Sequence, residues 1–183
     1  MKVLQACSDG LDTVVLCPTG FIGPYDYKIS LMGQFFIDYM QGNNKFIVNG
    51  AYDYVDVRDV AHAHILAARQ ARSGHTYIIS GHRVDMYQMT DALEKLTGIE
   101  PPKFWLKPGL ANFASYLSTF YCLLSNSRPQ FTCYSWSTLN SNSYISSQKA
   151  QKELGYCPRP FEQSLKDTVI WYRELINPAP ASP

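Results

Sequence analysis

Residues 13–26 place a short apolar, β-branched run before two glycines, and this arrangement constrains the fold more than any other part of the chain. The run 13–16 is typical of a fully buried parallel strand. A phosphate-binding loop after such a strand needs a glycine three residues before Gly20, where the chain has Cys17. Pro24, directly after the second glycine, favours a turn over the start of a helix. The segment therefore predicts a strand ending in a Pro/Gly loop, not a cradle for dinucleotide phosphates.

Composition indicates a compact domain without a nucleic-acid surface. The chain has 183 residues, of which 46% are apolar and 17% charged, so it can bury a core. Its net charge is +1 and its Lys and Arg residues are scattered, which excludes a basic nucleic-acid footprint.

Cysteine usage and hydropathy predict a cytoplasmic location. The five cysteines, at positions 7, 17, 122, 133 and 157, form no C-x-x-C pair and leave one over, as expected for reduced thiols. The N-terminus has no apolar core of a secretory signal. The longest apolar run, 110–124, is shorter than the roughly 20 residues of a membrane-spanning helix. We expect no membrane span.

The first half of the chain predicts alternating strands and helices. Strands are expected at 45–48, followed by an Asn49-Gly50 turn, at 54–57 and at 75–79. Helices are expected at 31–40, at 60–68 with Asp59 as N-cap and an end at Ser73-Gly74, and at 86–96 with Asp85 as N-cap and an end at Thr97-Gly98. This order predicts an α/β domain with a partly parallel sheet.

The second half predicts mainly helices. They are expected at 110–124, at 147–154 between the cap Ser146 and Gly155, and at 161–175 after an extended connector, 156–160. The Ser/Asn/Thr-rich connection 125–142 is a candidate substrate loop. We expect one α/β domain over 1–176 and a disordered tail at 177–183.

Three motifs in order resemble a known family. They are GLDTVVLCPTGFIGPYD at 10–26, YVDVRDVA at 54–61 and SSQKAQKELGYCPRP at 146–160. Together they are similar to the C-terminal half of an extended short-chain dehydrogenase/reductase, the NAD-dependent epimerase/dehydratase superfamily. The branch that fits best is dihydroflavonol-reductase-like or 3β-hydroxysteroid-dehydrogenase-like.

This resemblance implies a Rossmann-type fold whose N-terminal half binds NAD or NADP and whose C-terminal half shapes the substrate site. The family's complete G-x-x-G-x-x-G loop and Tyr-x-x-x-Lys pair are not in the sequence, and none of its 13 tyrosines has Lys four residues later. Such an unaided Tyr, with a pKa near 10, is a poor proton donor at neutral pH. We therefore expect the C-terminal part of the fold, with substrate-domain helices and no N-terminal dinucleotide-binding half. We assign no catalytic residue, and we expect a missing N-terminal half as partner.

The resemblance assigns Pro18, Thr19 and Gly20 to the cofactor, because the family's chain leaves the central sheet there beside the nicotinamide. The alternative is a strand-terminal turn with no ligand.

The following loop and helix resemble a wall of the substrate pocket, which makes Tyr25, Met32, Phe35 and Phe36 candidate contacts to a small hydrophobic substrate. The alternative is that Met32, Phe35 and Phe36 are core residues. Tyr52 stands where sugar-nucleotide members carry an Arg for the diphosphate, which disfavours a nucleotide-sugar substrate.

Other polar residues of the first half are expected to be structural. Arg58 can pair with a nearby carboxylate, and Asp59 can satisfy helix amides. His62 and His64, two apart on a helix, face different sides and cannot share a metal ion. We expect no metal site.

Two functions remain open. The chain is either the substrate-binding half of an NAD(P)-dependent oxidoreductase for a hydrophobic carbonyl or alcohol, or a non-catalytic binding or interaction module. A sugar-nucleotide epimerase or dehydratase fragment is a further alternative within the family. An uncovered strand 13–16 predicts a sheet edge that favours a homo-oligomer.

Overall fold

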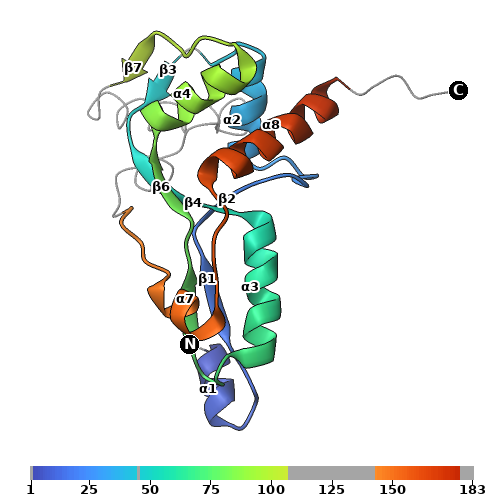
Figure 1. Ribbon diagram of the computed structural model, residues 1–183, viewed down its shortest axis with the longest axis vertical. Coiled ribbons are helices and arrows are strands. Elements are labelled where there is room, and N and C mark those ends of the chain that lie inside the picture. Colours follow the sequence, from blue (N-terminus) through green and yellow to red (C-terminus); the bar gives the residue numbers. More distant parts are fainter. Residues whose placement is uncertain (1, 45, 107–142, 178–183) are drawn as a thin grey trace, which may run out of the picture.

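The computed structural model describes residues 2–44, 46–106 and 143–177, and the strands within these ranges form three small sheets (Figure 1). β1 (Val15–Pro18) pairs in parallel with β5 (Thr76–Ile79). β4 (Ala51–Asp56) lies between β2 (Gly20–Ile22), to which it is parallel, and β6 (His82–Asp85), to which it is antiparallel. β3 (Phe46–Val48) pairs in parallel with β7 (Phe104–Leu106). The predicted α/β class with a partly parallel sheet is confirmed.

Helices lie between and around these strands. The described helices are α1 (Lys2–Ser8), α2 (Leu31–Met40), α3 (Val57–Gln70), α4 (Met86–Thr97), α7 (Gln148–Leu154) and α8 (Phe161–Ile176). In Figure 1, α1, α3 and α7 lie around β1 at one end of the molecule, and α2, α4 and α8 lie at the other.

The first buried cluster joins α2, α4 and α8 to β2, β4 and β6. Phe36 and Tyr39 come from α2, Leu93 from α4, and Leu165 and Tyr172 from α8; each is at most 2% exposed. The Tyr39 hydroxyl donates to the carbonyl of Ile99 (2.9 Å), which ties α2 to the end of α4. Together with α8, these contacts give the loop between β2 and α2 a rigid base.

The second buried cluster covers one face of β5. Tyr77 and Ile79 point into it and meet Ala63 of α3 and Leu154 of α7, all at most 1% exposed. On the opposite face of the same strand, Ile78 is 42% exposed. Since parallel sheets are normally covered on both faces, this pair of strands has one face without a helix among the described residues.

Two predicted helix caps are corrected. Asp56 rather than Asp59 is the N-cap of α3, and its side chain accepts the amide of Arg58 (2.8 Å). The strand before it ends one residue earlier than expected, so the helix also starts earlier. α3 ends at Gln70 rather than at Ser73-Gly74. The expected cap of α4 is confirmed: Asp85 and Gln88 form a reciprocal capping box.

Other boundaries also differ from the prediction. The strand expected at 13–16 lies at Val15–Pro18, and Gly20–Ile22 forms a second strand instead of a loop. Asn49-Gly50 does not close a hairpin, because β3 pairs with β7 and not with β4. The N-cap position of α7 is Ser147, not Ser146, and it makes no side-chain cap bond.

The helix predicted at 110–124 and the substrate loop predicted at 125–142 lie outside the described residues, as does most of the predicted tail. Among the described residues, no helix has the length and apolar character needed to cross a bilayer.

Candidate functional site

The chain passes from one sheet to another at Thr19, between β1 and β2. The Thr19 hydroxyl donates to Oδ1 of Asp53 (2.6 Å), and the Gly81 amide donates to the same oxygen (2.9 Å). Asp53 is 2% exposed, so these donors satisfy a buried carboxylate. The end of β1 is thereby fixed to β4, which belongs to another sheet.

Gly20 lies against an aromatic ring. A Cβ at this position would stand 2.6 Å from Cε1 of Tyr52, so only glycine fits without displacing that ring. Tyr52 in turn contacts Tyr54 edge to face, with ring centroids 5.7 Å apart. A partly exposed chain segment therefore lies at the carboxyl end of the parallel strand β1. It comprises the predicted cofactor residues Pro18, Thr19 and Gly20.

The loop between β2 and α2 holds two residues in the left-handed region. Tyr25 has a φ of 77° and Ile29 a φ of 46°. Positive φ values are unfavourable for both residues, and most of all for Ile29, because it is β-branched. Asp26, between them, anchors the loop: its Oδ2 accepts the Ser30 amide (2.7 Å) and the Tyr172 hydroxyl (2.7 Å). Ser30 then caps α2 through the Gly33 amide (3.0 Å).

Gly33 is a glycine inside a helix for a packing reason. A Cβ at this position would overlap the hydroxyl of Tyr172 and crowd the carboxylate of Asp26. The hydrogen bond between α8 and the loop therefore crosses α2 at the one helical position that has no side chain. Glycine lowers the helix propensity at this position, but its missing side chain leaves room for that bond.

A cavity of about 250 Å³ lies beneath this loop, and we call it the loop cavity. Its lining is mostly apolar, with polar groups from the side chains of Tyr25, Asp26, Ser30, Thr168 and Tyr172. The lining residues are Phe21, Ile22, Gly23, Pro24, Tyr25, Asp26, Ser30, Met32, Gly33, Phe36, Val57, Thr168 and Tyr172.

Three of the four predicted substrate residues line this cavity. Of these three, Tyr25 is exposed, Met32 is half-buried and Phe36 is buried. Phe35 does not line it: its ring packs against Phe36 (5.7 Å) and Tyr39 (6.3 Å).

The sequence interpretation missed the polar part of the cavity. Asp26 and Tyr172 are 146 positions apart, and nothing local links them. The signal that was present is Gly33, since a glycine inside a helical pattern often marks a close approach.

Hydrogen bonding sets the charge of the Asp26 carboxyl. Partial burial alone would raise the pKa of Asp26, but the hydrogen bonds from Ser30 and Tyr172 outweigh it and lower the pKa. For the partner, burial raises the pKa of the Tyr172 hydroxyl, and the nearby Asp26 charge raises it further. At neutral pH the pair is therefore a carboxylate accepting from a neutral phenol.

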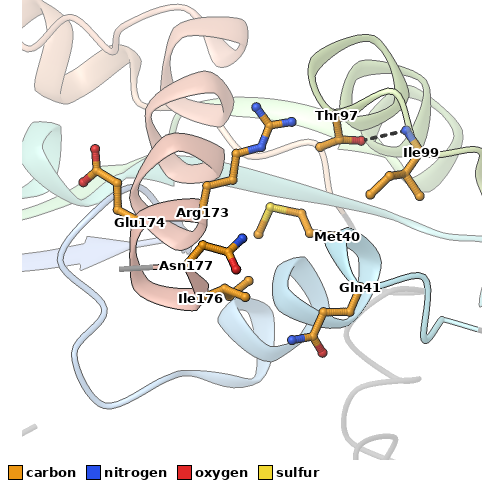
Figure 2. A pocket seen from close by; sticks show the side chains of 8 residues that line it. All are labelled: Met40, Gln41, Thr97, Ile99, Arg173, Glu174, Ile176 and Asn177. Atoms are coloured by element: carbon orange, nitrogen blue, oxygen red, sulfur yellow. Dashed lines mark hydrogen bonds between the residues drawn. The ribbon is translucent and has the colours of Figure 1, made fainter. Parts of the chain in front are cut away.

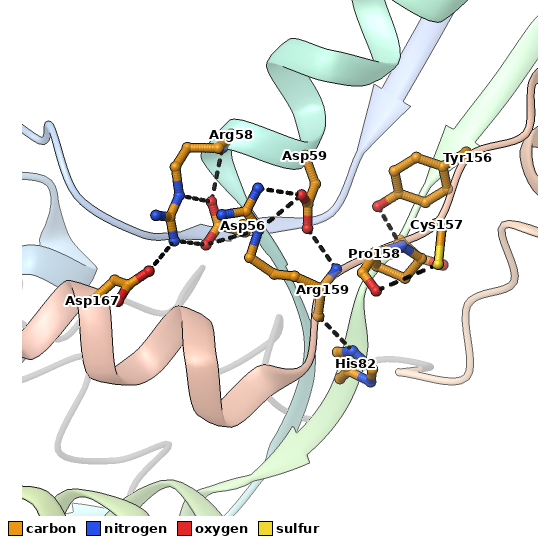
Figure 3. Close-up of polar contacts among 10 residues, drawn as sticks. Asp56, Arg58, Asp59, His82, Tyr156, Cys157, Pro158, Arg159 and Asp167 are labelled. Atoms are coloured by element: carbon orange, nitrogen blue, oxygen red, sulfur yellow. Dashed lines mark hydrogen bonds and ion pairs between the residues drawn. The ribbon is translucent and has the colours of Figure 1, made fainter.

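A network of charged residues fixes the start of α3 next to the cavity (Figure 3). Arg58 bridges Asp56 (2.7 Å) and Asp167 of α8 (2.8 Å). The Asp56 side chain is fully buried, and a Cβ on Gly23 would lie 3.3 Å from its Oδ1. The network therefore supports the cavity wall at Gly23.

Arg159 extends this network to the connector before α8. It pairs with Asp59 (2.7 Å) and approaches Asp56 (3.7 Å), while its carbonyl contacts Nε2 of His82 (2.9 Å) (Figure 3). The pairing expected for Arg58 agrees with these contacts, whereas Asp59 binds Arg159 instead of the helix amides that were its expected partners.

A second cavity, of about 560 Å³, lies where α2, α4 and α8 end (Figure 2). It shares no residue with the loop cavity. Arg173, on its wall, donates to the Leu96 carbonyl (3.0 Å) at the end of α4, so this guanidinium already serves as a helix cap. Its lining comprises Met40, Gln41, Thr97, Ile99, Arg173, Glu174, Ile176 and Asn177.

The two histidines of α3 do not form a site together. Nδ1 of His64 contacts the Val60 carbonyl (2.8 Å), and His62 is exposed. Throughout the described parts of the chain, no group of three His, Cys, Asp or Glu could hold a metal ion.

Comparison with curated proteins gives relatives over nearly the whole chain. The sterol demethylase protein B of Methylococcus capsulatus is 31% identical over 169 residues, which is 90% of this chain and 51% of that protein. The chain spans about half the length of the curated relatives it matches. No family model matches the sequence.

Solved structures share the fold. The crystal structure of gox2253 matches with a TM-score of 0.77 and 28% identity, over 95% of this chain and 53% of that one. The dTDP-glucose 4,6-dehydratase of Bacillus anthracis, solved in complex with NAD, matches with a TM-score of 0.66 and 19% identity, over 95% of this chain and 49% of that one. These matches lie in the C-terminal halves of epimerase/dehydratase proteins of the Rossmann type.

Proposed function

Because the chain belongs to the extended short-chain dehydrogenase/reductase superfamily, we propose that it is the substrate-binding part of an NAD(P)-dependent oxidoreductase for a hydrophobic carbonyl or alcohol. The observation that carries this proposal is the loop cavity. It is a largely apolar pocket, and its lining begins at Phe21, two residues after Thr19 in the sequence. Ligand pockets of enzymes have this composition, with apolar walls and a few placed polar groups.

The residues present fit one end of a nicotinamide cofactor. Thr19 and Gly20 stand at the carboxyl end of a parallel strand, where α/β sheets bind ligands, and both are partly exposed. They do not fit its phosphates, because Gly20 and Phe21 are in strand β2 and not in a turn that opens a helix. Pro18, Thr19 and Gly20 would hold the nicotinamide end, and the cofactor would supply or accept the hydride.

The proposed substrate contacts are Tyr25, Met32 and Phe36. Tyr52 supports an uncharged substrate, because its ring packs on Gly20 and Tyr54 and offers no cation to a diphosphate. A proton donor and the dinucleotide phosphates' binding loop would come from a complementary Rossmann half.

One observation favours a second candidate, a non-catalytic binding module. The sequence has no Tyr-x-x-x-Lys pair, so this polypeptide carries no activated tyrosine of the kind that the chemistry requires. A module of this kind would use the same loop cavity without turnover.

Cofactor titration separates the two candidates. NADH and NADPH would be titrated by fluorescence against the chain alone and against the chain mixed with a polypeptide carrying the glycine-rich loop and the Tyr-x-x-x-Lys pair. The oxidoreductase proposal predicts tight binding of one cofactor in the mixture only. Gly20→Ala should weaken that binding by displacing Tyr52, and Gly20→Ala with Tyr52→Leu should restore it. No binding in either sample would favour the binding module.

A further inference from the structure

The loop that covers the cavity adopts a costly conformation around one side chain. Tyr25 and Ile29 occupy the unfavourable left-handed region on both sides of Asp26. Such strain persists only where the surroundings over-determine it, and here the Ser30 amide and the Tyr172 hydroxyl hold the carboxylate from two elements. The loop is built to present this carboxylate.

The neighbouring helix α2 is also adapted to this carboxylate. Gly33 leaves α2 without a side chain where the Asp26–Tyr172 bond crosses it. Stability alone does not require this bond, because an alanine at position 33 in apolar contact with α8 would stabilise the crossing as well. The backbone of two elements is therefore adapted to keep one polar pair at the cavity.

The charge of this pair faces mostly apolar walls. Among the described residues, Asp26 is the only carboxylate in the lining, and none of these residues contributes a lysine or arginine to the loop cavity. The Ser30 amide and the Tyr172 hydroxyl both donate to Oδ2, and the Ser30 side chain is a further hydrogen-bond partner of this carboxylate. Because the hydrogen bonds lower its pKa, the group is ionised at neutral pH and can accept but not donate.

We propose that Asp26 is a specificity-determining residue that binds the hydroxyl of an apolar alcohol in the loop cavity. The apolar body of the ligand lies against Ile22, Met32 and Phe36, and its hydroxyl donates to the Asp26 carboxylate. A ketone of the same shape has no donor and leaves the carboxylate without this bond. The inference rests on the proposed function, since it takes the loop cavity as the substrate pocket.

Ligand titration of the chain by protein-observed NMR tests this inference without any cofactor. Cyclohexanol and cyclohexanone have the same ring, and the methyl signal of Met32 would report their arrival. A hydrogen bond to a charged group predicts about tenfold tighter binding of the alcohol. Asp26→Asn should reduce the preference to about twofold or less, because the amide also donates to the ketone. Asp91→Asn, an exposed carboxylate outside the cavity, should leave it unchanged.

Equal affinities for the two ligands in the wild-type chain would overturn the proposal, and so would binding of neither. The wild-type ratio decides this even if Asp26→Asn fails to fold. Met32→Trp, which puts a larger side chain into the lining of the cavity, should abolish the binding of both ligands; retained binding would place them elsewhere and overturn the proposal too. Because no cofactor is present, these outcomes are independent of whether the assembled enzyme turns over.

Discussion

The Tyr172 hydroxyl donates to Oδ2 of Asp26 over 2.7 Å and thereby joins α8 to the loop before α2, 146 residues away in the sequence. The bond connects the last described helix to the wall of the loop cavity. Its geometry leads to three predictions about stability.

Removing the donor should destabilise the fold. Tyr172→Phe leaves a partly buried carboxylate with one donor fewer, and we expect a loss of roughly 1–3 kcal/mol in the free energy of unfolding, measured with urea. Tyr156→Phe is the control, since Tyr156 is similarly buried (3% against 2% exposed) but donates to a neutral carbonyl. The control should lose about 1 kcal/mol. A larger loss in the control would contradict the importance of the Asp26 charge.

Acid should remove the Asp26 contribution selectively. The pKa of Asp26 is lowered in the folded state, so its contribution is present above the ordinary Asp value of about 3.9 and is lost as pH falls through the lower folded pKa. The stability difference between the wild type and Asp26→Asn should be constant from about pH 7 to pH 5 and shrink below about pH 4. A difference that grows on acidification would refute this account.

Alanine at position 33 should reverse the usual effect of helix propensity. An exposed Gly→Ala change in a helix stabilises by about 1 kcal/mol, but Gly33→Ala should destabilise by about 1–3 kcal/mol because its Cβ meets Tyr172. In a double-mutant cycle, Tyr172→Phe should relieve part of this cost. Additive effects of the two changes would show that the crossing is not tight.

The buried ion pair at the start of α3 should outweigh a shorter one at the surface. Arg58→Met leaves the fully buried Asp56 with Arg159 at 3.7 Å as its remaining cation, and we expect a loss of about 2–3 kcal/mol. The exposed pair Lys95–Asp91 is the control at 2.6 Å, and Lys95→Met should have no measurable effect. Thermal unfolding of both variants checks this, and equal losses would speak against the network.

The uncovered face of β5 should drive self-association. We expect the chain to form a homo-oligomer at high concentration by light scattering, through the face that exposes Ile78 beside its register partner Cys17. Ile78→Lys should weaken association. Ile170→Lys on α8 is a matched control, because Ile170 is 43% exposed against 42% for Ile78. A monomeric wild type at all concentrations would rule this interface out.

A helix cap could be predicted from the sequence where the cap and its partners lie within one helix. Asp85 was predicted as the cap of the right helix, and its bonds with Gln88 lie within four residues. The α3 cap was misplaced because Asp56 and Asp59 are both suitable residues, and only the pairing of β4 with β2 decides where the strand ends.

Contacts between distant segments were not readable. β6 and β7 are three to four residues long, and His82 and Arg83 give β6 no apolar alternation, so pairing with β4 and β3 defines them. The apolar side of the candidate site followed from the resemblance, through Tyr25, Met32 and Phe36. The role of the Asp26 carboxylate was not predicted, because it depends on a hydrogen bond from Tyr172, near the other end of the chain.

Hydride transfer in the assembled protein tests the central claim most directly. The chain would be mixed with a complementary Rossmann half, and the reduction of oxidised nicotinamide would be followed with a hydrophobic alcohol as substrate. The account predicts turnover that requires both polypeptides and that falls when Met32→Trp closes the loop cavity. A mixture that binds cofactor but transfers no hydride, or turnover unaffected by Met32→Trp, would contradict it.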